Sequence, residues 1–178
     1  PAAINNNFTG AGSIGFPIEV VITCTWSHEL AYSWGEMMGK MSREMNATGW
    51  YAPALNTHRS AFTARNYEYF SEDGVLAGWM TADAVRGAHS QGVYSTIKHF
   101  AMYDSNGKMV CAWATEQSMR EIYLRPFEIA VKEGGADAAM EAWSFIGNKW
   151  VGEIFALNND ILRGEWGFRG FIVSDFFR

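Results

Sequence analysis

The sequence predicts an α/β fold that forms part of a (β/α)8 TIM-type barrel, with about five βα units present. Five short apolar segments are typical of strands, and each is followed by a segment that can be helical. This alternation predicts parallel βαβ units joined by right-handed connections. Several of the predicted strands also place polar side chains at their carboxyl ends. In a barrel, such strand ends all contribute to one ring of functional groups.

The choice between a barrel and an open sheet depends on those polar residues. An open, doubly wound sheet would fit 178 residues better than a closed barrel, which typically has about 250 residues. An open sheet, however, gathers its ligand site at one switch point. Because the polar groups here follow several different strands, the sequence favours part of a barrel.

The five predicted strands are apolar segments. They span residues 19–26, 49–55, 93–100, 136–143 and 171–176. A first helix is expected after Ser27 as its N-cap, and a second after Ser71, ending at Gly92. A third covers residues 115–135 with a kink at Pro126, and a short fourth lies around residues 156–167.

Composition excludes several classes of function. The net charge is -5 and no Lys/Arg-rich run is present, so a nucleic-acid partner is not expected. The longest apolar run is far shorter than the roughly 20 residues that span a bilayer, so we expect a soluble protein without a membrane partner. The four histidines occur singly, without the spacing of metal ligands, and no metal site is predicted.

One motif resembles a dinucleotide-binding loop. "GAGSIG", residues 10–15, fits the pattern G-x-G-x-x-G. It follows a polar stretch rather than a strand and does not lead into a helix, so no helix N-terminus is available for a pyrophosphate. We interpret it as a loop, and a nucleotide-binding open sheet remains only as an alternative that rests on this motif.

Three clusters of polar residues remain as candidate functional groups. They are "RNYEYFSED", with Arg65; "IKHF", with Lys98 and His99 at the end of an apolar strand; and "IVSDFF", with Asp175 in the same kind of position. Each alone is compatible with a salt bridge, a helix cap or a solvated charge. Together, carboxylates and cations suit a polyhydroxylated ligand, because both bind hydroxyl groups through charge-assisted hydrogen bonds.

The long segments of the chain resemble the catalytic barrel of glycoside hydrolase family 3, the β-glucosidase family. The resemblance is carried, in this order and spacing, by "APALNTHRSAFTARNYEYFSEDGVLAG", "TIKHFAMYD", "REIYLRPFEIAVKEGG" and "ILRGEWGFRGFIVSDFF". It extends over nearly the whole chain. It implies that Asp175 is the catalytic nucleophile and that Arg65, Lys98 and His99 hold the sugar at the point of cleavage.

The resemblance also implies a reaction. We expect a retaining, exo-acting β-glycosidase that hydrolyses terminal, non-reducing β-linked sugars through a covalent glycosyl-Asp intermediate. Its partner would be a β-linked oligosaccharide or other β-glycoside, and no metal or organic cofactor is needed.

The sequence departs from the family pattern at two places that affect the sugar site. After residues 136–143, where many members have an Asn-Arg pair, this chain has Ser144 and Phe145. The Arg that commonly follows Lys-His-Phe is not evident, and Asp104 occupies that loop. Asp104 and Ser144 are therefore weaker candidates for binding substrate, and the sequence does not identify the sugar.

The resemblance further predicts that residues 1–178 are an incomplete barrel and that the later domain carrying the acid/base carboxyl is absent from this chain. The remainder of the same enzyme is then a required partner, and the isolated chain is expected to be inactive. The alternative is a carbohydrate-binding protein that keeps an incomplete sugar pocket. The sequence carries no signal that decides between a cytoplasmic and a secreted protein.

Overall fold

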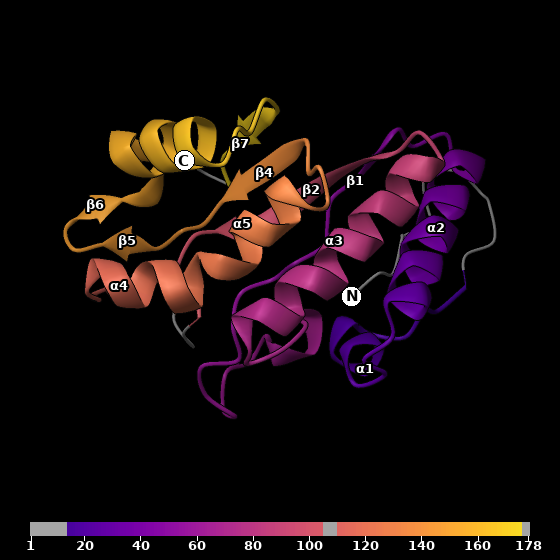
Figure 1. Ribbon diagram of the computed structural model, residues 1–178, viewed down its shortest axis with the longest axis horizontal. Coiled ribbons are helices and arrows are strands. Elements are labelled where there is room, and N and C mark those ends of the chain that lie inside the picture. Colours follow the sequence, from indigo (N-terminus) through magenta and orange to yellow (C-terminus); the bar gives the residue numbers. More distant parts are fainter. Residues whose placement is uncertain (1–13, 105–109, 176–178) are drawn as a thin grey trace.

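The computed structural model describes residues 14–104 and 110–175, and its core is a parallel sheet covered by helices (Figure 1). Four strands pair in the order β1-β2-β4-β7, and every pair in this sheet is parallel. The strands are β1 (Gly49–Trp50), β2 (Tyr94–Phe100), β4 (Ala138–Glu141) and β7 (Phe171–Val173). The predicted parallel α/β architecture is confirmed.

The helices lie between the strands in the chain and beside them in space. α3 packs against both α2 and α5, and Figure 1 shows the three following one another along the sheet. The helical elements are α1 (Glu19–Thr23), α2 (His28–Glu44), η2 (Asn66–Glu68), α3 (Gly74–Ser90), α4 (Glu116–Ser118), η3 (Met119–Tyr123), α5 (Arg125–Lys132), η4 (Val151–Glu153) and η5 (Ala156–Glu165).

The contact between α2 and α3 depends on glycine. A Cβ atom at Gly35 would lie 2.0 Å from the backbone oxygen of Ala84, and one at Gly87 would lie 2.1 Å from the backbone oxygen of Tyr32. Both distances are far below van der Waals contact. The two helix backbones therefore approach each other more closely than any side chain at these positions would permit.

The prediction of a strand over residues 19–26 is wrong, because the chain forms the helix α1 there. Its buried residues are Glu19, Ile22 and Thr23, whose spacing of three and four is the period of a helix rather than of a strand. The Thr23 hydroxyl also donates to the Glu19 carbonyl over 3.0 Å, which supports the helical turn. The described residues thus contain four strands of the parallel sheet instead of five.

Two helix boundaries differ in detail from the prediction. Ser27 caps α2 as expected, but the N-cap of α3 is Asp73 rather than Ser71, because Asp73 Oδ1 accepts from the backbone N–H groups of Val75 and Leu76. Near Pro126 the predicted long helix is interrupted, and α5 begins at Arg125. The structure thus has a break at Leu124 between η3 and α5, where a kink in one helix was predicted, and Pro126 lies in the first turn of α5.

A second, smaller sheet was not predicted. It consists of β3 (Cys111–Ala112), β5 (Phe145–Ile146) and β6 (Lys149–Trp150), with β3 and β5 parallel and β5 and β6 antiparallel. Each strand has only two residues, which is too short for a periodic signal in the sequence. This sheet joins the segment after β2 to the segment after β4.

Within the described ranges, no helix is long and apolar enough to cross a membrane. Residues 10–13 of the "GAGSIG" motif, which was predicted to be a loop, lie outside the described residues.

Candidate active site

The carboxyl ends of β2 and β7 place three of the predicted site residues. Lys98 and His99 are near the end of β2, and Asp175 follows β7 by two residues. Arg65 is the residue that precedes the short helix η2. Since β2 and β7 run parallel in one sheet, their carboxyl ends lie on the same side of the molecule.

Arg65 and His99 contact each other directly. Arg65 Nη2 lies 3.0 Å from His99 Nε2. A guanidinium can only donate, so Nε2 must accept and the ring proton must be on Nδ1. Burial lowers the pKa of His99 well below 6.5, and the positive charges of Arg65 and Lys98 lower it further. His99 is therefore a neutral imidazole whose orientation is defined by Arg65.

Glu68 holds Arg65 in this position. Arg65 Nε donates to Glu68 Oε1, and the Glu68 side chain is almost fully buried. Burial, the largest single effect, would lower the pKa of Arg65, but the hydrogen bond to Glu68 and the charges of Tyr69, Glu68 and Tyr103 together outweigh it, and the pKa is raised. The two side chains therefore form an ion pair next to His99.

The backbone of His99 is fixed by Asn56. The Asn56 amide donates to the His99 carbonyl over 3.0 Å and accepts from the His99 N–H over 2.8 Å. The peptide bonds Lys98–His99 and Phe100–Ala101 are both cis. Asn56 therefore ties the loop after β1 to the end of β2 at the residue that carries the imidazole.

Lys98 lies among three carboxyl groups. Burial lowers its pKa, whereas the negative charges of Glu68, Glu19 and Asp175 act in the opposite direction. Its Nζ atom is 5.4 Å from the centroid of the Tyr51 ring, a distance typical of a cation–π contact. The Lys98 ammonium group therefore interacts electrostatically with all three carboxyl groups.

Asp175 completes this group. It is 8% exposed, and its charge acts on Lys98 and, together with burial, raises the pKa of Tyr51. Asp175 is thus a buried carboxyl group close enough to Lys98 and Tyr51 for its charge to act on both.

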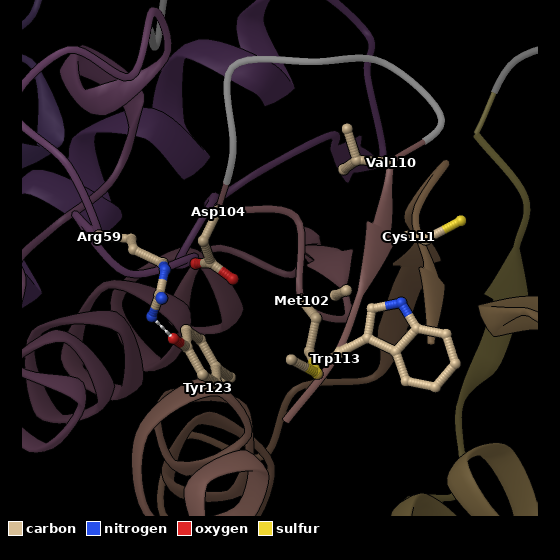
Figure 2. Close-up of a pocket in the computed structure, with 8 residues that line it drawn as sticks. Arg59, Met102, Asp104, Val110, Cys111, Trp113 and Tyr123 are labelled. Carbon is tan, nitrogen blue, oxygen red and sulfur yellow. Dashed lines mark hydrogen bonds between the residues drawn. The ribbon is translucent and has the colours of Figure 1, made fainter. Parts of the chain in front are cut away.

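The structure brings Arg65, Lys98, His99 and Asp175 into one constellation, but it places the two weaker candidates differently. Ser144 is fully buried and its hydroxyl donates to the Ala101 carbonyl over 2.7 Å, so it connects two backbone segments. Asp104 accepts from Thr57 and lines a separate cavity (Figure 2).

Three residues of the site were missed from the sequence. The Tyr103 ring lies 5.3 Å from the ring of His99 and 5.4 Å from the Arg65 guanidinium. Tyr51 faces Lys98. Glu19, on α1, is buried, and burial raises its pKa to about 7. Tyr51 lies within one predicted strand and Tyr103 follows another, so both could have been included on that ground, whereas Glu19 depends on a helix that the sequence did not predict.

The described part of the chain comprises residues 14–104 and 110–175. No group of three or more His, Cys, Asp or Glu side chains in these ranges is arranged to hold a metal ion.

Comparison with protein families gives one match over most of the chain. Residues 5–178 match the model described as "Glycosyl hydrolase family 3 N terminal domain". Among curated relatives, Beta-glucosidase A of Butyrivibrio fibrisolvens is 40% identical over 168 residues, and Beta-glucosidase B of Emericella nidulans is 37% identical over 171 residues. Each alignment covers 93% of this chain and 20% of the relative.

Solved structures give the same result for the fold. β-Glucosidase 3B from Thermotoga neapolitana in complex with glucose superimposes with a TM-score of 0.87 and 40% identity, over 90% of this chain and 23% of that one. β-Glucosidase from Kluyveromyces marxianus in complex with glucose gives a TM-score of 0.88 and 33% identity. This superposition covers 91% of this chain and 20% of that one. The predicted part of a (β/α)8 barrel is confirmed, and the chain spans about a fifth of the length of the curated relatives it matches.

Proposed function

Since this chain belongs to glycosyl hydrolase family 3, a family of glycoside hydrolases, we propose that it supplies the nucleophile side of the active site of a retaining β-glycosidase. The observation that carries the proposal is the position of Asp175, buried beyond the carboxyl end of β7 with its charge acting on Lys98. Arg65 and His99 occupy the same side of the sheet.

In the proposed reaction, a carboxylate oxygen of Asp175 attacks the anomeric carbon and forms a glycosyl ester. The bond to the leaving oxygen breaks, and a second carboxyl group gives its proton to that oxygen. The same group then takes a proton from water, which attacks the anomeric carbon and releases the sugar and the Asp175 carboxylate. In retaining enzymes the two carboxyl groups are about 5 Å apart.

The residues around Asp175 have defined tasks in this scheme. Arg65 and Lys98 donate hydrogen bonds to sugar hydroxyl groups, and charge-assisted bonds of this kind are stronger than neutral ones. Neutral His99 presents its buried Nδ1–H group, which has no hydrogen-bond partner among the described residues.

We further propose that residues 1–178 form an incomplete barrel and that the acid/base carboxyl comes from the remainder of a longer enzyme. The proposal is supported by the lengths of the curated relatives, of which the chain spans about a fifth. A terminal β-linked glucose is the proposed substrate unit, since the relatives are named β-glucosidases and two of the similar structures hold glucose.

The test uses the intact polypeptide that carries this chain. Asp175→Asn should lower kcat/KM for an aryl β-glucoside by at least about 1,000-fold, because the nucleophile is lost. Asp160→Asn, an exposed acid on η5, is the matched control and should leave the rate unchanged. A 2-fluoro-glucoside with a good leaving group should add the mass of one sugar to the enzyme and none to Asp175→Asn.

An unchanged rate in Asp175→Asn would show that the nucleophile is another residue. Binding of glucose by the intact protein with no hydrolysis of any β-glucoside would instead favour a carbohydrate-binding protein.

A further inference from the structure

Glu19 is a buried carboxyl group on the short helix α1 to which the proposed reaction gives no task. It is 1% exposed, whereas Val21, two residues later in the same helix, is 50% exposed. Residues two apart in a helix lie on nearly opposite sides, so α1 turns its acid inward and a valine outward. This arrangement is the reverse of the usual one, because glutamate side chains are rarely fully buried and valine side chains often are.

The backbone that carries Glu19 is fixed. The Trp34 indole N–H donates to the Pro17 carbonyl over 3.1 Å, which ties the entry of α1 to α2. The Thr23 hydroxyl donates to the Glu19 carbonyl over 3.0 Å. α1 also packs against η2, the helical turn that includes Glu68. Glu19 is therefore held beside the turn that forms one side of the candidate active site.

The charge of Glu19 acts on Lys98. Burial lowers the pKa of Lys98, and the positive charge of Arg65 acts in the same direction. Three carboxylates oppose this effect, and they belong to Glu68, Glu19 and Asp175. Since these charges come from α1, from η2 and from the residue beyond β7, the ammonium group lies between carboxyl groups of three different elements.

These carboxylates leave the N–H groups of Lys98 available. Lys98 forms no ion pair with a residue in the described part of the chain, and its Nζ atom lies 5.4 Å from the centroid of the Tyr51 ring. Glu19 therefore acts on the ammonium group from a distance rather than through a hydrogen bond. The donors of Lys98 remain free for a ligand.

Glu19 is ionised where its charge is needed. Burial raises its pKa to about 7, and the negative charge of Glu68 acts in the same direction, whereas Lys98 acts against it. Above about pH 7 Glu19 therefore carries a negative charge. This charge opposes the release of the proton from Lys98.

We propose that Glu19 is a positioning residue of the active site, which acts through Lys98 and keeps its ammonium group charged while leaving its N–H groups to the substrate. A residue that served only to fill space in the core would be better apolar, because burying a carboxyl group is costly. The proposal rests on the glycosidase function proposed above and adds a residue to its site.

Two variants of the intact polypeptide separate charge from packing. Glu19→Gln keeps the shape and removes the charge, whereas Glu19→Asp keeps the charge and shortens the side chain by one methylene group. If the charge matters, Glu19→Gln lowers kcat/KM for an aryl β-glucoside about tenfold and Glu19→Asp keeps most of the activity. A role in packing predicts the reverse order, because aspartate leaves a cavity and glutamine does not.

Glu29→Gln is the matched control. Glu29 is an exposed acid in the first turn of α2, and its replacement should leave kcat/KM unchanged. Glu19→Gln should melt at least as high as the parent, because glutamine has nearly the same volume and no charge to bury. Loss of activity without loss of stability would separate the proposed role from a structural one.

Lys98 can be titrated without any hydrolysis. Competitive labelling with acetic anhydride at a series of pH values, followed by mass spectrometry of the peptide that contains Lys98, measures the pKa of this residue. In Glu19→Gln one negative neighbour is removed, so the pKa of Lys98 should fall by about one unit. In Glu29→Gln it should stay the same as in the parent.

The proposal is overturned if Glu19→Gln matches Glu29→Gln in kcat/KM or in the pKa of Lys98, or if Glu19→Asp is the more impaired of the two Glu19 variants. A parent enzyme that hydrolyses no β-glucoside is a different result, which contradicts the glycosidase function. The labelling of Lys98 still decides in that case whether the charge of Glu19 acts on it.

Discussion

Arg65 donates to His99 Nε2 over 3.0 Å, so the imidazole of His99 carries its proton on Nδ1 and has a cation next to its acceptor nitrogen. A second proton would have to bind at Nε2. Burial of the ring disfavours the charged form, and the positive charges of Arg65 and Lys98 repel the proton. The imidazole consequently serves as a fixed, neutral hydrogen-bonding group rather than as an acid.

The first prediction concerns the titration of His99. Because burial and the two cations lower its pKa well below 6.5, the His99 ring should stay neutral at and below that pH. NMR of histidine ring nitrogens in the intact polypeptide measures this directly. In Arg65→Gln one positive neighbour is removed, and the pKa of His99 should rise. A His99 signal that titrates near 6.5 in the parent protein would contradict the assignment.

The lowered pKa of His99 also leads us to expect that the free energy of unfolding depends on pH. In the unfolded chain His99 binds a proton below about pH 6.5, whereas in the folded chain it binds one only well below that value. The unfolded state therefore binds more protons in this window, and the free energy of unfolding falls as the pH falls through it.

For Asp104 we expect the free energy of unfolding to depend on pH in the opposite direction. Burial raises its pKa from 3.8 to about 7, although the hydrogen bonds from Thr57 and the charge of Arg59 oppose the shift. Between these values the folded state holds a proton that the unfolded state has released. The free energy of unfolding should therefore fall as the pH rises through this window, by at most about 1.4 kcal/mol per pH unit from this one group.

Asp104→Asn measures that contribution. The variant cannot ionise, so the difference in unfolding free energy between parent and variant should change steadily from about pH 4 to about pH 7 and level off outside this window. Denaturant unfolding at several pH values provides the data. Glu19, whose pKa is also about 7, is present in both proteins and cancels. A difference independent of pH would show that Asp104 is ionised throughout.

A further prediction concerns the α2–α3 contact. Gly35→Ala should destabilise the protein by about 1–3 kcal/mol, because the new methyl group would meet backbone atoms of Ala84 that cannot move aside. The gain in helix propensity, about 1 kcal/mol, acts in the other direction and is smaller than the clash. Gly15→Ala is the control, since a Cβ atom there meets nothing within 4 Å. Equal thermal stability of the two variants would mean that the helices are farther apart.

The last prediction tests how Glu68 acts through Arg65. Glu68→Gln removes the negative charge that holds Arg65 and opposes the lowered pKa of Lys98. We expect kcat/KM for an aryl β-glucoside to fall by about tenfold, equal to about 1.4 kcal/mol. The pH profile should also shift, which a purely structural effect would not cause. Glu72→Gln, a nearby exposed acid, should leave both unchanged.

The sequence predicted the parts of this fold that have a long, uniform signal. The helix α2 was expected from the helical spacing of its apolar residues, α3 from a capping residue and a terminal glycine, and the seven-residue strand β2 from its apolar run. Residues 19–26 were misread since a five-residue helix of β-branched side chains has the same composition as a buried strand. Lys98 and Asp175 could be found because they follow apolar runs.

The rest of the site depends on tertiary structure. Nothing local to Asn56 shows that it will bind the backbone of His99, 43 residues away along the chain. Likewise, the acceptor of the Arg59 side chain, Tyr123, belongs to a helical turn 64 residues later. Such pairs become visible only when the strands are in register and the loops have closed over them.

The small sheet β3-β5-β6 has a consequence for the position of one aromatic ring. Trp113 follows β3, but its position depends on Gly147 in the turn between β5 and β6. Two loops of different βα units therefore position this indole together. A change of length in either loop would move the indole, whereas the pairing of β2, β4 and β7, which precede Asp175 and include Lys98, does not depend on these loops.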